Sequence, residues 1–173
     1  MNIFRYISLF LVALLILFFS LGLFKKEVGY VNEITVNADR QEVFDAFSDT
    51  VMMKKWLPGF VSFEKVKGNE KDSGSVWRLK LEQDGEVYEM AETFTEFNEG
   101  NKVSYILEND VLTNSVEVQF IDVPGGTKVI SGNTIKGNNS MWQSIFILLK
   151  SGFHKHGQEA LENLKNTVEK NKN

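Results

Sequence analysis

The last thirty residues before the C-terminal tail carry the longest regular pattern in the chain. Between residues 140 and 169, apolar side chains return every three or four positions, from Trp142 and Ile145 to Leu164 and Val168. This spacing is the period of one helix face, and the segment contains no proline. A helix of that length spans about 45 Å. Because an ordinary helix could not cover so long an apolar face, we expect this helix to pack against a sheet.

The middle of the chain predicts that sheet. Residues 27–36 alternate apolar and polar side chains, and similar segments follow at 60–66, 75–81, 87–97, 102–108, 113–121 and 127–135. Turn sequences such as Asp84-Gly85 and Pro124-Gly125-Gly126 separate them. Connections this short favour antiparallel hairpins over parallel crossovers.

Two short helices are expected between the first and second strands. Asn37-Ala38-Asp39 offers an N-cap to a helix that turns Val43, Phe44 and Phe47 inward. Ser48-Asp49-Thr50 can cap a second helix that ends near Trp56, where Pro58-Gly59 turns the chain. The predicted order is strand, two short helices, six strands and a long helix, which is an α+β fold.

The N-terminal segment is apolar enough for a membrane anchor. Residues 7–24 hold no charged side chain and lie between Arg5 and Lys25-Lys26, so they just reach across a bilayer core. A cleaved signal peptide stays open as an alternative, since Ser20-Leu21-Gly22 fits a cleavage site; a buried core helix is a third. We favour the anchor because signal cores are shorter. The flanking charges balance, so the side of the membrane stays open.

These boundaries divide the chain into three parts. Residues 1–26 form the predicted anchor, residues 27–170 one domain, and residues 171–173 a tail. The expected localisation is a single-pass membrane protein.

Composition excludes several function classes. The net charge is −4 and no basic cluster interrupts the sequence, so nucleic-acid binding is not expected. Cysteine is absent, which excludes disulfides, thiolate nucleophiles and cysteine-ligated zinc. Fourteen phenylalanines supply bulky side chains for a core.

The order of these segments resembles the START-like, Bet v-like helix-grip superfamily, often called polyketide cyclase/dehydrase-like or SRPBCC proteins. Five local matches carry the resemblance over residues 27–170: residues 34–38 leading into Val43-Phe44, Lys55-Trp56-Leu57-Pro58-Gly59, Thr95-Glu96-Phe97, Gly125-Gly126-Thr127-Lys128-Val129 and residues 160–165. Each match marks a turn or a core position, and their order over the whole domain is the stronger signal.

The resemblance implies a seven-stranded antiparallel sheet wrapped around the C-terminal helix, usually with a hydrophobic cavity between them. Alternation along the strands, together with the helix pattern, gives a candidate lining. It consists of Trp56, Phe63, Trp77, Leu79, Tyr88, Met90, Glu92, Phe94, Tyr105, Phe120, Leu149 and Phe153. Two interpretations stay open: a ligand pocket with few polar anchors, or a core that these side chains fill.

Glu92 is the polar member of that set. It shares one side of its strand with Tyr88, Met90 and Phe94, and an inward carboxylate would have a raised pKa unless partnered. On that side it would be a polar anchor or an acid/base group. We expect instead that the opposite register, with Val87 and Ala91, faces inward, or that a bulge places Glu92 in water.

The start of the long helix has two further features. Residues 145–149 are apolar on every side, which suggests packing under the two short helices, a place at a pocket mouth, or contact with the bilayer. Gly152 and Gly157 each weaken a helix by about 1 kcal/mol. We therefore expect close backbone packing or a bend at these glycines.

No set of residues in the sequence indicates catalysis. His154 and His156 diverge on a helix, so they cannot share a metal as an i, i+4 pair can. The sequence has no GxSxG elbow, HExxH motif or glycine-rich phosphate loop. We assign no catalytic residue, cofactor or metal. The predicted function is a membrane-anchored, non-catalytic binding domain for a small hydrophobic ligand. The alternatives are a cyclase or hydratase using the same cavity and a filled-core interaction domain.

Overall fold

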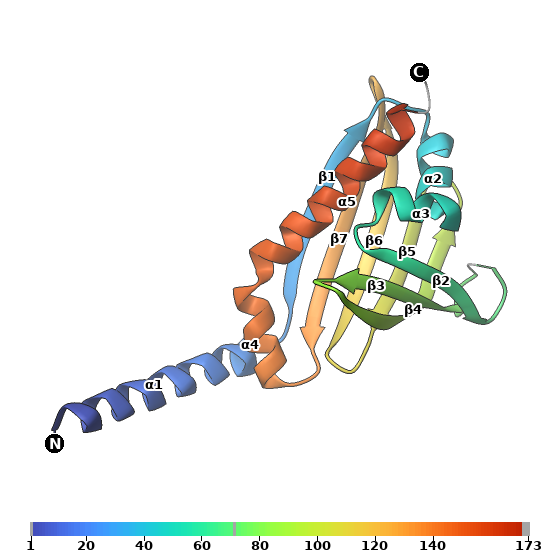
Figure 1. The fold of residues 1–173 in the computed structure, drawn as a ribbon. Helices are drawn as coiled ribbons and strands as arrows, with labels where there is room; N and C mark the ends of the chain where they lie inside the picture. The colour runs from blue at the N-terminus through green and yellow to red at the C-terminus, as the bar shows by residue number, and fades with distance from the viewer. Residues whose placement is uncertain (1, 71, 171–173) are drawn as a thin grey trace.

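A computed structural model describes residues 2–70 and 72–170 of the chain (Figure 1). The predicted tail, residues 171–173, lies outside the described residues. The elements follow in the order α1 (Asn2–Phe24), β1 (Val28–Val36), α2 (Arg40–Ser48), α3 (Thr50–Trp56), β2 (Phe60–Lys67), β3 (Val76–Gln83), β4 (Glu86–Asn98), β5 (Lys102–Glu108), β6 (Leu112–Val123), β7 (Gly126–Gly137), α4 (Ser140–Leu148) and α5 (Lys150–Lys170).

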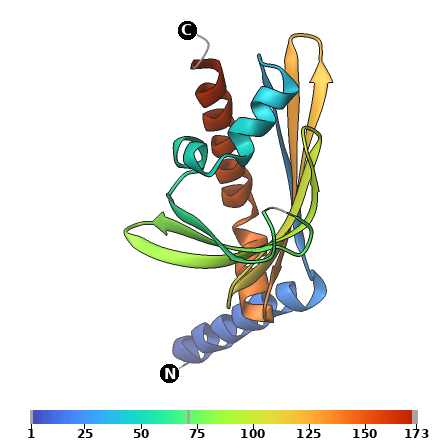
Figure 2. The same cartoon turned by 90° about the vertical axis from the view of Figure 1, so that its right-hand side faces the viewer.

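The strands form one antiparallel sheet in the order β1-β7-β6-β5-β4-β3-β2. Strands β2 to β7 join in sequence through hairpins, and β1 pairs with β7 at the far edge. Figure 2 shows that the sheet is strongly curved, since β2, β3 and β4 swing away from the plane of β1, β7 and β6. The predicted helix-grip fold is therefore confirmed.

The concave side of the sheet faces α5, α2 and α3 (Figures 1 and 2). Helix α5 buries Leu161, Leu164 and Val168 in a main core that it shares with α2, α3 and the inward strand residues. A second, smaller cluster lies around Val28, Ile135 and Phe146 near α4. The two clusters lie at opposite ends of α5, and the space between them becomes the site described below.

Side-chain caps place the short helices as expected. The Asp49 carboxylate accepts a hydrogen bond from the Val51 N–H at 2.7 Å and begins α3. Asp39 occupies the N-cap position of α2 without a side-chain cap bond. Val43, Phe44 and Phe47 of α2 are buried, as predicted.

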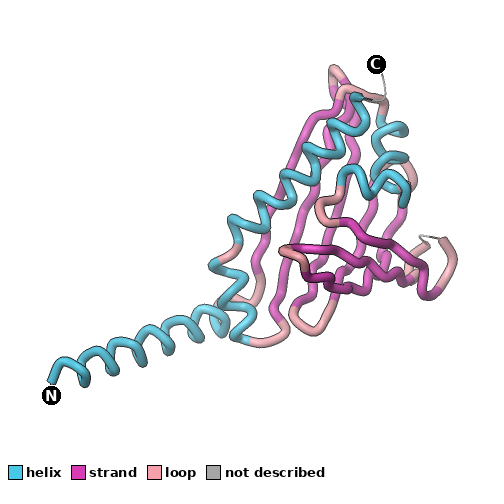
Figure 3. The backbone as a smooth tube through the Cα atoms, in the orientation of Figure 1, coloured by secondary structure: helices cyan, strands magenta, loops and turns pink. Residues whose placement is uncertain are grey.

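The C-terminal helical segment is interrupted, so the prediction of one continuous helix from residue 140 to 169 was wrong. Leu149 has φ −88° and ψ 5°, which ends α4. The tube in Figure 3 shows the interruption as a short loop between the two helices. The apolar period continues through Leu149 in the sequence, but α4 packs against α1 and β7 whereas α5 packs against β1, α2 and α3. Because the two helices follow different surfaces, the helix axis breaks between them.

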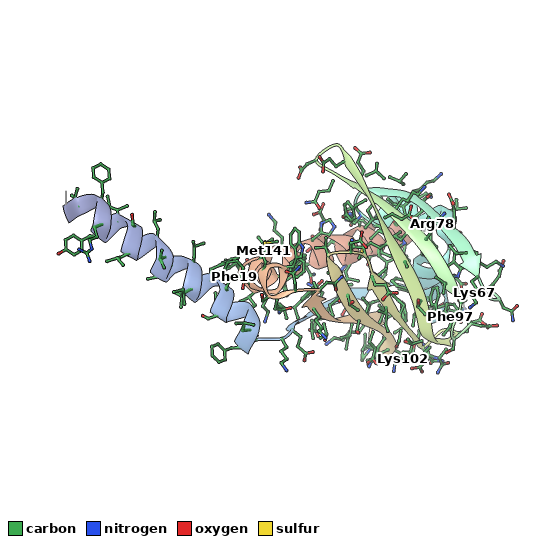
Figure 4. The ribbon with its side chains drawn as sticks, turned by 90° about the horizontal axis from the view of Figure 1, so that it is seen from below. Phe19, Lys67, Arg78, Phe97, Lys102 and Met141 are labelled. Atoms are coloured by element: carbon green, nitrogen blue, oxygen red, sulfur yellow. The ribbon has the colours of Figure 1, made fainter. Side chains whose placement is uncertain are left out.

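The N-terminal helix docks its last turns on α4. The Ser144 hydroxyl donates to the Phe18 carbonyl oxygen at 2.6 Å and accepts from the Gly22 N–H at 3.0 Å. A Cβ atom at Gly22 would lie 2.1 Å from the Ser140 carbonyl oxygen, so only glycine allows this approach. Figure 4 shows Phe19 and Met141 beside each other at this junction, with the rest of α1 extending away from the domain.

Residues Ile3–Phe24 of α1 form a helix long and apolar enough to cross a membrane, and almost none of it is buried. The apolar residues 145–149 do not pack under α2 and α3, so that expectation was wrong. Phe146 is buried in the second cluster, while Leu148 and Leu149 are 61% and 51% exposed.

Candidate functional site

A cavity of about 640 Å³ lies between α5, α3 and the concave face of the sheet. Its wall combines side chains of both core clusters, from Phe47, Met53 and Trp56 at one end to Ile135 and Phe153 at the other. Protein pockets for small ligands fall in the range of roughly 300–1,000 Å³. The space between sheet and helix is therefore hollow, although both interpretations were open from the sequence.

Most of the candidate lining borders this cavity. The residues that do so are Trp56, Phe63, Leu79, Tyr88, Met90, Glu92, Phe94, Tyr105, Leu149 and Phe153. Trp77 and Phe120 are buried in the main core without bordering the cavity. Trp77 stacks on Phe63 with ring centroids 4.7 Å apart. Phe120 contacts the ring edges of Phe44 and Phe47 beneath α2. The role of these residues in ligand binding stays a prediction.

Aromatic rings give the cavity fixed walls at the α3 end. Phe47 stacks on Trp56 with ring centroids 5.1 Å apart, and the Trp56 indole donates to the Ala46 carbonyl oxygen at 3.1 Å. Phe94 lies between Phe97 and Tyr105, with centroid distances of 6.0 and 6.1 Å. Rings held by stacking and hydrogen bonds lose little freedom when a ligand binds, so this wall is preorganised.

Glu92 lies in the cavity wall, so the expectation that it faces water was wrong. It is 6% exposed and borders the cavity together with Tyr88, Met90 and Phe94. A register shift does occur in β4, but between Phe94 and Glu96, beyond Glu92. The even-numbered residues therefore face inward up to Phe94, and the shift then turns Phe97 inward as well.

Polar side chains on β6 and β7 form a second feature that the sequence reasoning missed. The Asn114 amide donates to Asn133 Oδ1 at 3.2 Å, and the Asn133 amide donates to Ser131 Oγ at 3.1 Å. All three residues border the cavity. A signal was present, because Asn114 shares its side of the strand with Phe120, which was predicted to face inward.

Three tyrosines in the wall remain protonated at neutral pH. Burial raises the pKa of Tyr30 to about 12 and also raises the pKa of Tyr88. Burial raises the pKa of Tyr105 still further, and the nearby charges of Glu92 and Tyr30 add to that shift. Each phenol can therefore donate a hydrogen bond within the cavity.

The first turns of α5 form one rim of the cavity. Gly152 borders it, and a Cβ atom there would meet nothing within 4 Å. At Gly157 a Cβ atom would lie 2.6 Å from Asn32 Oδ1, so this glycine lets α5 approach β1. The expected close packing thus holds for Gly157 and not for Gly152. His156 reaches the rim, while the His154 ring meets the edge of Tyr30 at 6.3 Å.

Within residues 2–70 and 72–170, no three His, Cys, Asp or Glu side chains come close enough to hold a metal ion. A second hollow, of about 600 Å³, lies across small residues such as Gly29, Ser104 and Gly132. It is shallow and open, whereas the cavity under α5 has walls on several sides. The cavity under α5 is therefore the candidate ligand site.

The curved sheet, the C-terminal helix and the cavity between them define a domain of the helix-grip, polyketide cyclase-like class. Residues 37–169 match the model of the family described as activator of Hsp90 ATPase homolog 1-like protein. Since the match covers well over half of the chain, the protein belongs to this family. No curated protein matches the sequence significantly.

Solved structures share the fold at low sequence identity. Zhui aromatase/cyclase from Streptomyces sp. R1128 superposes with a TM-score of 0.70 and 11% identity, over 85% of this chain and 96% of that one. Protein CV1439 from Chromobacterium violaceum gives 0.67 and 15%, over 82% and 96%. Ara h 8.0201 gives 0.62 and 18%, over 82% and 97%.

Proposed function

We propose that this protein is a non-catalytic binding domain that takes up a small hydrophobic molecule, a lipid or an isoprenoid-like compound. The cavity carries the proposal, because about 640 Å³ stays open between two well-packed clusters. An open volume among buried apolar side chains costs stability unless something fills it. A wall that is mostly apolar, with a few polar groups, suits a ligand with an apolar body.

A cyclase or hydratase is the second candidate. Two observations favour it. Three structural neighbours are named ARO/CYC or aromatase/cyclase, and Glu92 and Tyr105 lie on neighbouring strands of the wall. Acid–base catalysis at neutral pH needs groups whose pKa values lie near the working pH. The raised pKa of Tyr105 keeps that phenol from acting as a base there. We therefore favour binding without turnover.

We further propose that α1 holds the domain at a membrane as an uncleaved single span. The helix of 23 residues is about 35 Å long, against about 30 Å for a bilayer core. Its docking on α4 supports retention of the helix. Cleavage after Gly22 would remove both Phe18 and Gly22 from their hydrogen bonds to Ser144.

The test of binding uses the full chain, extracted from membranes in mild detergent. Native mass spectrometry, followed by solvent extraction and mass analysis, identifies any molecule that remains bound. The blocking variant is Gly152→Trp, because a side chain at this rim position meets open space. Its matched control is Ser151→Trp, one residue earlier on an exposed position that does not border the cavity.

Binding predicts a reproducible apolar compound with wild type and Ser151→Trp, and its loss with Gly152→Trp. An empty protein that also excludes an environment-sensitive apolar dye would overturn the proposal. Chemical conversion of the bound compound during incubation would instead favour the enzyme. For the anchor, the intact mass of the membrane-extracted protein decides, since cleavage after Gly22 would remove α1.

A further inference from the structure

One part of the cavity wall is polar, and it crosses the sheet from β4 to β7. Glu92 on β4 and Asn114 on β6 both pair with Leu107 of the intervening strand β5. Their backbones are therefore two strands apart, roughly 10 Å. Leu107 itself lies between them, and Tyr105 lies two residues along β5, where it pairs with Phe94 and Val116. Asn133 on β7 adjoins Asn114. We call Glu92, Tyr105, Asn114 and Asn133 the polar stripe.

Within the polar stripe, the Oδ1 atom of Asn114 is an acceptor that receives no hydrogen bond from the described residues. The residue is 9% exposed, and none of the described residues donates to its Oδ1 atom. Its amide group donates to Asn133, whose own amide donates to Ser131. These hydrogen bonds run from β6 to β7 along the cavity wall and leave Asn114 Oδ1 unused. A buried acceptor without a donor costs about 1–3 kcal/mol, so such atoms in folded proteins usually have a partner.

Glu92 disfavours anions in the cavity. Its carboxyl group is 6% exposed on the wall of the same cavity. When Glu92 is ionised, an anionic ligand group nearby would be repelled strongly because little water screens the two charges. Tyr105 is a neutral phenol and supplies no positive charge.

The basic side chains of the cavity lining lie at its rim, away from the polar stripe. Lys155 and His156 reach the opening from α5, and Glu159 follows Lys155 by one helical turn. Among the described residues that line the cavity, Lys155 and His156 are the only basic side chains, and Lys155 lies beside an acidic one. The interior offers a carboxylate or phosphate group phenol donors and no positive charge.

We propose that the cavity selects an uncharged apolar alcohol, whose hydroxyl group donates a hydrogen bond to Asn114 Oδ1 within the polar stripe. The inference rests on the proposed binding function and names the class of ligand. The apolar body of the alcohol lies against the aromatic wall of Phe47, Trp56 and Phe94. Fatty acids and phosphorylated lipids of the same length bind more weakly, because the interior of the cavity holds no positive charge for their anionic groups and places the Glu92 carboxyl near them.

The test is displacement of the neutral dye N-phenylnaphthylamine from the full chain in lipid nanodiscs. The fluorescence measured with the blocked variant Gly152→Trp in the same nanodiscs gives the signal of dye dissolved in the lipid, and this signal is subtracted. Dodecanol and dodecanoate compete at about pH 8, where the acid is ionised. We expect dodecanol to displace the dye at concentrations at least about tenfold lower, the value of one good hydrogen bond.

Two variants assign that preference to the polar stripe. Asn114→Leu keeps the volume and removes the acceptor, so it should weaken dodecanol about tenfold and leave dodecanoate unchanged. Glu92→Gln removes the carboxyl group and should strengthen dodecanoate. If Asn114→Leu does not fold, Glu92→Gln still tests whether the carboxyl group weakens the binding of dodecanoate. Ser151→Trp is the control for an unrelated substitution near the opening.

The results separate this inference from the proposed function. Stronger competition by dodecanoate would overturn the alcohol class and indicate that the Asn114 amide points its N–H into the cavity or that Lys155 binds the head group. If dodecanol and dodecanoate displace the dye equally well, and Asn114→Leu changes neither, the alcohol class is also overturned. The proposed binding of a hydrophobic molecule would then still stand. Failure of wild type to bind the dye above the Gly152→Trp level would overturn both.

Discussion

The hydroxyl group of Ser144 on α4 donates a hydrogen bond of 2.6 Å to the carbonyl oxygen of Phe18 on α1. The same hydroxyl accepts from the Gly22 N–H, so a single side chain of α4 bonds to two backbone groups that are also i, i+4 partners within α1. A substitution that separates α1 from α4 should therefore be detectable without any change in the cavity.

Gly22→Leu should separate α1 from α4. Its Cβ atom would fall 2.1 Å from the Ser140 carbonyl oxygen, which cannot move without shifting the start of α4. Because the chain has no cysteine, Phe19→Cys and Met141→Cys can be joined by a flexible bifunctional maleimide. We expect efficient cross-linking in an otherwise native chain and a large loss with Gly22→Leu. Val12→Leu, farther along the exposed helix, should cross-link as well as the parent.

Gly152 and Gly157 on α5 should respond oppositely to alanine. Gly152→Ala meets open space, so the better helix former should raise the free energy of unfolding by about 0.5–1 kcal/mol. Gly157→Ala would press on Asn32, whose amide is held by the His154 carbonyl at 2.9 Å and by Gln158 at 3.2 Å. We expect this variant to lose about 1–3 kcal/mol. Urea unfolding of the full chain in detergent measures both, and equal effects would contradict the packing at Gly157.

The caps of α2 and α3 provide a second matched pair. Asp49→Ala removes the acceptor for the Val51 N–H and should lower the free energy of unfolding by about 1 kcal/mol. Asp39→Ala removes no side-chain cap bond, so we expect a smaller loss. The difference between their thermal midpoints is the measurement. A larger loss for Asp39→Ala would show that the cap bond of Asp49 contributes little.

Stability should fall at alkaline pH through the buried tyrosines. The pKa of Tyr30 rises from 10.0 to about 12 on folding, so between these values the unfolded state binds fewer protons than the folded state. The free energy of unfolding then decreases as pH rises, by up to about 1.4 kcal/mol per pH unit for one group. Below about pH 10 this contribution is fully present.

Tyr30→Phe is the variant for that measurement. Denaturant titrations between about pH 9 and pH 12 should give a shallower decline for Tyr30→Phe than for wild type. Tyr105 has a raised pKa for the same reason and continues to contribute. Parallel curves for the two proteins would mean that Tyr30 is equally ionised in the folded and unfolded states.

The sequence predicted the strands because alternation and turn residues are local. β5 has the predicted bounds, and the ends of the other strands differ from the prediction by at most two residues. The break at Leu149 was not predictable, since the apolar period continues through it and the cause is the contact of α4 with α1. Similarly, alternation cannot tell which side of β4 faces inward when both sides hold apolar residues.

The candidate site was predicted in its aromatic part and missed in its polar part. Trp56, Phe94 and Tyr105 follow the period of packed strands and helices, so the pattern identified them. Alternation along β6 places Asn114 on the inward side, but its bond to Asn133 depends on the pairing of β6 with β7, which no local pattern contains. The hollow itself depends on the distance between two layers, a quantity that composition does not determine.

The register shift between Phe94 and Glu96 divides β4 into two parts with opposite alternation. Before the shift, even-numbered residues face the cavity; after it, the odd-numbered Phe97 does so. Deleting one residue shortly before Glu92 would reverse the alternation of the residues that precede the deletion. Their cavity-facing side chains would then turn outward, and the acidic Glu89 would turn inward. A length change at Thr95 would alter only the junction between the two parts. A change in the length of β4 at this one place would therefore leave the same residues lining the cavity.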